Sequence, residues 1–253
     1  MIVQPNTFNM YCHREPRFYL TVVWNGQWFK WENRNTNFLY GQPDGGPTHD
    51  APQNGYLNRS RVSLDYIPRD NNHPYRPAII FRMAEAYLSY AEALNESSER
   101  MSHKQEILDN LNKIRHRAGI AEYGTGTDEN GFTRIKINFS DQKEVRRLIH
   151  KERRVEFVGE GVRYHDLRRW KTAHYGIGNL NEQGENPDWG VNGPDYGMNY
   201  YGTEYTDQGD NAFFKRTKYM DRVYPRKFYW YPIHQSEIDK DPTLVQGPFW
   251  LGE

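Results

Sequence analysis

The sequence has 253 residues but only one cysteine, no excess charge of either sign and no long hydrophobic run. A single cysteine, Cys12, excludes a disulfide within the chain and says nothing about the redox compartment. The 33 basic and 33 acidic residues balance, so a nucleic-acid partner is not expected, because phosphate binding needs a basic excess or stripe. No stretch approaches the ~18 apolar residues of a membrane-spanning helix.

Motifs of catalysis and metal binding are also missing. The nine histidines are scattered, with no H-E-x-x-H or Cys–His metal pattern, and there is no G-x-S-x-G elbow. Asp44 and Asp50 lack the ordered spacing of a calcium loop. The sequence therefore predicts no catalytic residue, no metal site and no cofactor, and we do not expect an enzyme.

Aromatic side chains are the abundant feature. Hydrophobic residues make up only 36% of the chain, yet aromatics make up 15%, with 19 Tyr and 7 Trp, and the mean hydropathy is −0.99. Such flat, amphipathic side chains bury one face and keep a hydrogen-bonding edge.

Sustained helical periodicity occurs only between Arg76 and Trp170. The pattern predicts a first helix over 76–95, with Pro77 in its first turn. A second helix should begin at Ser102, whose spacing to Gln105 fits a capping box, and should stop at Gly119. The two helices would form an antiparallel hairpin of the tetratricopeptide type, whose exposed face needs a further element to cover it.

A third helix should start near Ser140 or Asp141. It and the segment after Gly161 carry more charge than an amphipathic face needs, with Arg and carboxylate interleaved. One interpretation is an anion site or an acid/base cluster. The other, which the mixed signs favour, is a network in which arginines and carboxylates pair with each other and tie helix to helix.

The region before the helices has β character. Residues 17–24 read as a strand, Asn25-Gly26 as a hairpin turn, and residues 27–32 as the returning strand. Three indoles, Trp24, Trp28 and Trp31, lie close together here, although the alternation of a strand prevents all three from facing the same way. They could be cross-strand packing or a platform on which the apolar faces of sugar rings stack.

Two long segments, 34–74 and 172–210, are rich in Gly, Asn and Pro and read as loops. The second contains Trp189 and Tyr200 among amides and carboxylates, which would suit a carbohydrate surface. The alternative, slightly favoured, is that this loop folds its own aromatics against the helices. Near the C-terminus, Trp230 and Trp250 are expected to be structural.

Five segments stand in the order and spacing typical of one family: EPRFYLTVVWNG, AEAYLSYAEALNE, LNKIRHRAGI, ERRVEFVGEGVRYHDLRRW and FYWYPIHQSEIDKDPTLVQGPFW. Together they resemble the SusD/RagB family, the outer-membrane glycan-binding lipoproteins that serve nutrient uptake and starch or glycan utilisation in Bacteroidetes. The resemblance implies a mainly α fold, with a tetratricopeptide-type hairpin packed against long irregular loops and a small β-hairpin. It also implies a surface-exposed place at the outer membrane and a SusC-like TonB-dependent transporter as partner.

The sequence departs from this family in one respect. Family members are about twice as long, and MIVQPNTFNM has neither the basic nor the apolar region of a signal peptide. The chain therefore resembles the C-terminal half of a SusD-like protein, for which an N-terminal half could be a further partner. We divide it into a β-hairpin with loops (1–75), a helical core (76–170) and an aromatic, Gly-rich C-terminal region (171–253).

These expectations define a function and a set of contacts. The chain should bind extracellular oligosaccharide or polysaccharide without cleaving it and deliver it to the transporter. The ring-stacking candidates are Trp24, Trp28, Trp31, Trp189 and Tyr200. Two alternatives remain: a helical-repeat scaffold that binds only protein, and, less favoured, a glycoside hydrolase, because a suitable pair of carboxylates cannot be recognised from sequence.

Overall fold

The structure, a computed structural model, describes residues 7–63, 66–67, 70–71, 73–75, 77–176 and 190–250, without the side chain of Trp31. It divides into two compact units, which we treat separately. Unit 1 comprises Met1–Gly161 and Met198–Lys215, and unit 2 comprises Val162–Gly197 and Arg216–Glu253. Among the described residues, no helix is both long and apolar enough to cross a membrane, and no group of three or more His, Cys, Asp or Glu residues could hold a metal ion.

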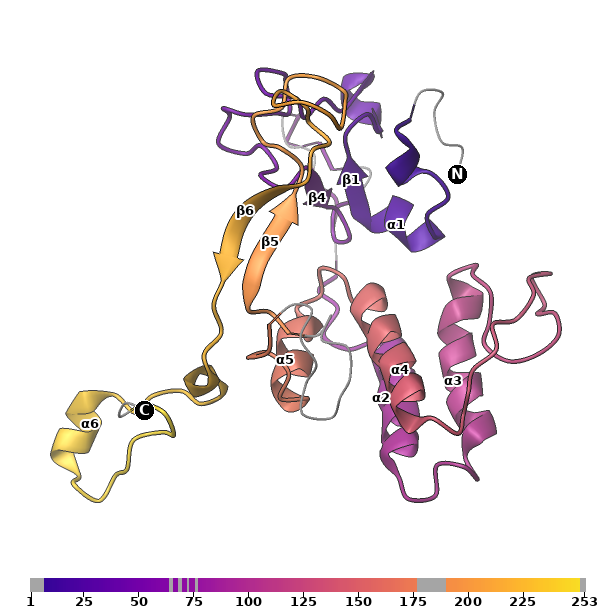
Figure 1. The fold of residues 1–253 in the computed structure, drawn as a ribbon, viewed down its shortest axis with the longest axis vertical. Coiled ribbons are helices and arrows are strands. Elements are labelled where there is room, and N and C mark those ends of the chain that lie inside the picture. The colour runs from indigo at the N-terminus through magenta and orange to yellow at the C-terminus, as the bar shows by residue number, and fades with distance from the viewer. Residues whose placement is uncertain are drawn as a thin grey trace. The chain divides into compact units, whose positions relative to one another are not determined.

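Three helices of unit 1 lie together (Figure 1): α2 (Met83–Glu96), α3 (Lys104–Arg117) and α4 (Gln142–Glu156). Helix α2 packs against both of the others, so α4 covers the face that an isolated α2–α3 hairpin would leave open. Small residues such as Ala84 and Ala91 on α2 are buried, which permits a close approach. From α3, Ile107 and Leu111 complete the core, as does Val145 from α4.

The helix ends confirm some expectations and correct others. Gly119 follows α3 with a φ of +65°, in the left-handed region expected of it, and Asp141 caps α4 by accepting hydrogen bonds from the backbone N–H of Lys143 and Glu144. Ser102, however, does not cap α3, because its hydroxyl donates to the carbonyl of Glu99. The first helix begins at Met83, so Pro77 is not in its first turn.

The strand expected over 17–24 is mostly helix. Helix α1 (Pro16–Thr21) is followed by β1 (Val22–Trp24), which pairs with β4 (Tyr56–Asn58). The Asn25-Gly26 turn therefore does not join the expected hairpin. After it, β2 (Trp28–Phe29) pairs with β3 (Arg34–Asn35), with a 3-10 turn, η2 (Lys30–Glu32), between them.

Two small apolar clusters support this part of unit 1. One contains Tyr11, Tyr19 and Trp24, and the other contains Phe38, Leu39, Met198 and Phe213. Tyr11 ends a short 3-10 turn, η1 (Asn9–Tyr11). Met198 and Phe213 belong to the segment that returns late in the chain, so residues far apart in sequence share this core.

Unit 2 contains α5 (Val162–Arg169), β5 (Gly193–Gly197), β6 (Thr217–Arg222), η4 (Arg226–Tyr229) and α6 (Gln235–Lys240). Strands β5 and β6 pair antiparallel, so part of the segment read as loop over 172–210 is strand. In total the described residues form six α-helices and only two-stranded antiparallel sheets. The predicted mainly helical fold with small strand pairs is confirmed.

Candidate functional site

The interleaved charges of α4 form a paired network. Arg17 of α1 donates to Glu152 at 2.6 Å and to Glu156 at 3.0 Å, and Arg115 of α3 donates to Glu152 at 2.9 Å. Arg82 and Arg117 also bind Glu156, and both carboxylates are buried. The prediction of mutual pairing is confirmed for α4, and this cluster is not open to a ligand.

Burial alone would raise the pKa of Glu156, but the guanidinium groups of Arg117 and Arg82 outweigh it and hold this pKa below the ordinary 4.5. The carboxylate is therefore ionised at neutral pH. Such a group stabilises neighbouring arginines and is unsuited to donating a proton.

A groove of about 320 Å³ lies on the β side of unit 1, and we call it the Trp28 groove. Trp28 and Phe29 of β2 line it with exposed rings, Trp28 being 48% exposed. Val23 of β1 and Leu57 of β4 supply apolar walls, and polar groups come from neighbouring loops. These polar lining residues are Gln27, Lys30, Thr36, Asp44, Thr48, Asp50, Arg59 and Ser63.

The two carboxylates of the groove differ in their surroundings. Asp44 accepts two hydrogen bonds from Arg34, at 2.6 and 2.9 Å, and one from the backbone N–H of Asn37 at 2.8 Å. Burial acts to raise the pKa of Asp44, but these partners lower it below its ordinary value. Asp50 is fully exposed. Asp44 is thus a fixed acceptor, whereas Asp50, whose carboxylate contacts only the exposed ring of His49 at 3.4 Å in the described structure, is accessible to hydroxyl groups.

Of the indoles proposed to stack on sugars, Trp28 is exposed and Trp24 is buried. Trp24 is only 6% exposed. The ring of Phe18 stacks on it at 5.5 Å, and Tyr19 meets it edge-on at 5.4 Å. Because its faces are occupied within the core, Trp24 is not retained as a sugar contact. Trp189 and the side chain of Trp31 lie outside the described residues.

Tyr200 is half-buried in a cluster with Tyr40 and Tyr201. Its ring rests directly on Gly46, where a Cβ would come within 2.5 Å of Tyr200 Cζ. Gly46 lies in the loop 41–50 that also lines the Trp28 groove through Asp44 and Thr48. One loop is therefore bordered by Trp28 and by the tyrosine cluster.

Sequence reasoning missed Phe29, Tyr40 and Arg59. Phe29 neighbours Trp28 directly. Both residues of β2 are exposed, whereas the alternation of a strand with one buried face would expose only one of them. Tyr40 joins Tyr200 and Tyr201 only through the fold, so no local pattern could have identified it.

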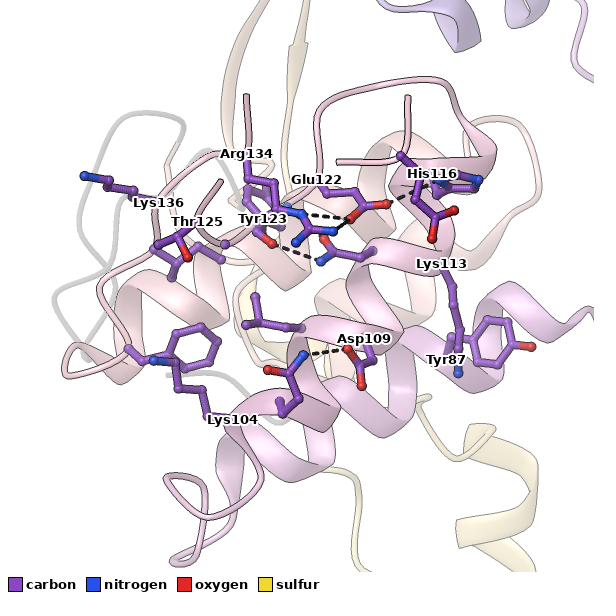
Figure 2. Close-up of a pocket in the computed structure, with 17 residues that line it drawn as sticks. Tyr87, Lys104, Asp109, Lys113, His116, Glu122, Tyr123, Thr125, Arg134 and Lys136 are labelled. Atoms are coloured by element: carbon purple, nitrogen blue, oxygen red, sulfur yellow. Dashed lines mark hydrogen bonds and ion pairs between the residues drawn. The ribbon is translucent and has the colours of Figure 1, made fainter. Parts of the chain in front are cut away.

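A larger hollow, of about 870 Å³, lies between α3 and the segment that follows it. Figure 2 shows that several of the polar groups lining it bind each other. Arg134 and His116 both contact Glu122, at 2.8 and 3.3 Å, while Gln105 donates to Asp109 at 2.8 Å. A ligand would have to displace these pairs, so the Trp28 groove is the better candidate.

Comparisons with known proteins agree with this fold. The chain is 32% identical to SusD-like protein P25 of Formosa agariphila over 109 residues (43% of this chain, 18% of that protein), and 32% identical to SusD-like protein P38 of the same organism over 103 residues (41% and 19%). A solved SusD-like protein of Bacteroides fragilis, BF3747, superposes with a TM-score of 0.65 at 26% identity, covering 96% of this chain and 40% of that one. The solved structure of BT4246 gives 0.64 at 24% identity, covering 94% and 38%.

The chain thus spans less than half the length of these relatives. The model of the SusD family nevertheless matches residues 3–250, almost the whole sequence. The matched residues include EPRF, IRHRAG and KERRVEF, which contribute Arg17, Arg115 and Glu152 to the paired network. This chain belongs to the SusD family.

Proposed function

We propose that the chain binds polysaccharide without cleaving it, at the Trp28 groove, as an accessory of a SusC-like TonB-dependent transporter in the outer membrane. The exposed indole of Trp28 above an apolar groove rimmed by polar groups is the observation that carries this proposal. Membership of the SusD family supports the accessory role.

The chemistry of the groove suits a sugar. A pyranose ring has apolar C–H faces and a rim of hydroxyl groups, so it needs a flat apolar surface flanked by hydrogen-bonding groups. Trp28 and Phe29 supply the surface, while Asp50, Gln27 and Arg59 supply donors and acceptors. Tyr200 contacts Gly46 in the loop 41–50, and the exposed ring of Tyr201 beside it adds a further aromatic surface next to this loop.

The expected affinity is low. An aromatic contact of this kind contributes about 0.5–1.5 kcal/mol beyond the area that it buries. A few such contacts correspond to a Kd on the order of 10 μM to 1 mM. Weak binding with fast release suits a protein that hands its ligand to a transporter.

Retardation in native gels that contain different soluble polysaccharides tests the proposal. We expect at least one polysaccharide to retard the chain, and Trp28→Ala to weaken that binding about 5- to 30-fold, equivalent to about 1–2 kcal/mol. Tyr75→Ala is the matched control, because Tyr75 is 91% exposed and lines none of the hollows described above.

Equal retardation of wild type and Trp28→Ala would remove the groove from the proposal. The scaffold alternative rests on the α2–α3 hairpin and predicts no retardation by any polysaccharide. It would be favoured if no polysaccharide retarded the folded chain while a transporter fragment bound it equally well with and without Trp28.

A further inference from the structure

Unit 2 contains a hollow of about 450 Å³ that has no role in the function proposed above. It is lined by four cationic side chains, Arg168, Arg169, Lys171 and Arg226. Arg169 pairs with the buried carboxylate of Asp166 at 2.9 Å, so its charge is already neutralised and the site is argued from the other cations. None of the described residues that line it is Asp or Glu. Its volume falls within the range of about 300–1,000 Å³ typical of small-ligand sites. We call it the α5 hollow.

Arg168 is held firmly by neutral groups. Its guanidinium donates to the carbonyls of Phe228 at 2.6 Å and Tyr229 at 2.7 Å, and to the hydroxyl of Tyr164 at 2.8 Å. These acceptors fix the position of the side chain but carry no formal charge. The positive charge of Arg168 is therefore oriented without being cancelled by them.

Lys171 adds a second cation just beyond α5. Its backbone has a φ of +56°, in the left-handed region, and its N–H donates to the carbonyl of Arg168 at 3.1 Å. Cations near a helix C-terminus interact favourably with the helix dipole, which explains part of this clustering. It does not explain Arg226, which comes from η4 and lines the same hollow.

An aromatic wall completes the site. Trp230 and Phe249 both line the hollow, with 43% and 42% of their surfaces exposed and ring centroids 5.8 Å apart. Trp250, in contrast, uses its indole N–H to donate to the carbonyls of Lys227 and Trp230, as expected of a structural residue. Exposed rings beside oriented cations fit a ligand that has both an apolar face and a negative charge.

We propose that the α5 hollow binds a sugar that bears an oxyanion, either the carboxylate of a uronic acid or a sulfate ester, so that the ligand of this chain is an acidic polysaccharide. This inference rests on the proposed function, because it names the substrate class of the same glycan-binding protein. The cations would bind the oxyanion through charge-assisted hydrogen bonds, and Trp230 or Phe249 would stack on the sugar ring.

Calorimetry on the full chain with matched ligands tests this. The ligands are a trisaccharide of galacturonic acid, a sulfated galactose trisaccharide and the neutral galactose trisaccharide. We expect one or both acidic ligands to bind at least tenfold more tightly than the neutral one. The acidic ligand that binds shows whether the oxyanion is a carboxylate or a sulfate ester. Raising the salt concentration should weaken this binding, because ions screen exposed charges.

Lys171→Asn is the diagnostic variant, since Asn removes the charge and tolerates the left-handed backbone. It should weaken acidic-sugar binding about tenfold, the size of one charged hydrogen bond. Arg226→Ala should do the same from a different element. Lys240→Asn, which removes an exposed charge from α6 in the same unit, should leave binding unchanged.

The outcomes separate the two proposals. Equal binding of acidic and neutral sugars, or no effect of Lys171→Asn and Arg226→Ala, overturns the α5 hollow even if Trp28→Ala abolishes retardation in gels. Acidic binding that depends on Lys171 but not on Trp28 supports the α5 hollow and overturns the groove. If no ligand binds in either assay, both proposals fail.

Discussion

Glu156 illustrates how a single side chain can join several segments. It accepts from Arg17 in α1, from Arg82 just before α2 and from Arg117 at the end of α3. Arginine suits this role because its planar fork offers several donors in fixed directions, which a lysine cannot. The second carboxylate, Glu152, lies one helical turn before Glu156 on α4 and binds Arg17 and Arg115. Two acids on one helix face therefore connect most of the helical core.

Replacing Glu156 with Gln should destabilise the chain by about 2–4 kcal/mol. The variant keeps the shape of the side chain but removes the negative charge that Arg117 and Arg82 bind. Arg82 keeps Glu160, so the cost should lie somewhat below the ~3–5 kcal/mol of breaking a buried pair completely. Urea unfolding at pH 7 measures this difference. Glu237→Gln is the control, because that exposed carboxylate pairs with Lys240 in α6 and should change stability by less than about 1 kcal/mol.

The same variant carries a signature in its pH dependence. Because the folded-state pKa of Glu156 lies below 4.5, its stabilising effect is fully present above the unfolded value and is lost as the pH falls through the folded value. The difference between wild type and Glu156→Gln should therefore be constant near neutrality and shrink in acid. A difference that persists unchanged at pH 3 would show that lost packing, not lost charge, is responsible.

At the scale of elements, the N-terminus of α4 depends on Asp141. Its carboxylate accepts from the backbone N–H groups of Lys143 at 2.9 Å and Glu144 at 3.2 Å. Asp141→Ala should lower the free energy of unfolding by about 1 kcal/mol, whereas Asp141→Ser should retain most of it. Thermal unfolding provides the measurement.

Ser102→Ala is a matched control for this experiment. Ser102 has the sequence pattern of a helix cap but does not bond to the N-terminus of α3, so its replacement should cost less than about 0.5 kcal/mol. A loss at Ser102 as large as that at Asp141 would mean that α3 begins differently in solution.

The elements differ in how far their sequence determined them. Asp141 and Gly119 mark helix ends through local chemistry, and both positions were predictable. The start of α2 was not, because Arg82 lies in extended backbone while its side chain binds Glu156 and Glu160. Likewise, residues 17–21 have the aromatic and β-branched composition of a strand. They form a helix in which Pro16 suits the first turn and Arg17 bonds to α4, so tertiary contacts override local preference.

The candidate site, too, could be predicted only in part from the sequence. Sequence identified a group of indoles, but not which of them faces solvent, because that depends on β1 pairing with β4 and not with the segment after Gly26. Trp24 became core and Trp28 became surface for this reason. The arginines of α5 were grouped with the charges of α4 in sequence, yet Arg168 bonds to carbonyl groups in unit 2 and does not join the α4 network.

For the whole molecule, a formal net charge of zero conceals a separation of charge. Carboxylates neutralise arginines in the α4 network, while the α5 hollow is lined by four cations, of which Arg169 pairs with Asp166. A balanced composition excludes a strongly basic protein, but it does not exclude a local site for an anion. The ligand is therefore better inferred from the separate surfaces than from the sum of charges.

We expect the chain to leave a bound polysaccharide at its original length. Glycoside hydrolysis generally needs two carboxyl groups, one of them a protonated acid whose pKa is raised. In the Trp28 groove, Asp44 is held ionised by Arg34 and by the backbone of Asn37, and Asp50 is fully exposed. Size-exclusion chromatography of the polysaccharide after prolonged incubation, with reducing ends counted in the same samples, measures cleavage. The binding-only role would be overturned if the polymer were shortened by the wild type but kept its full length with an Asp50→Asn variant. A groove that only stacks and hydrogen-bonds its ligand cannot break a glycosidic bond.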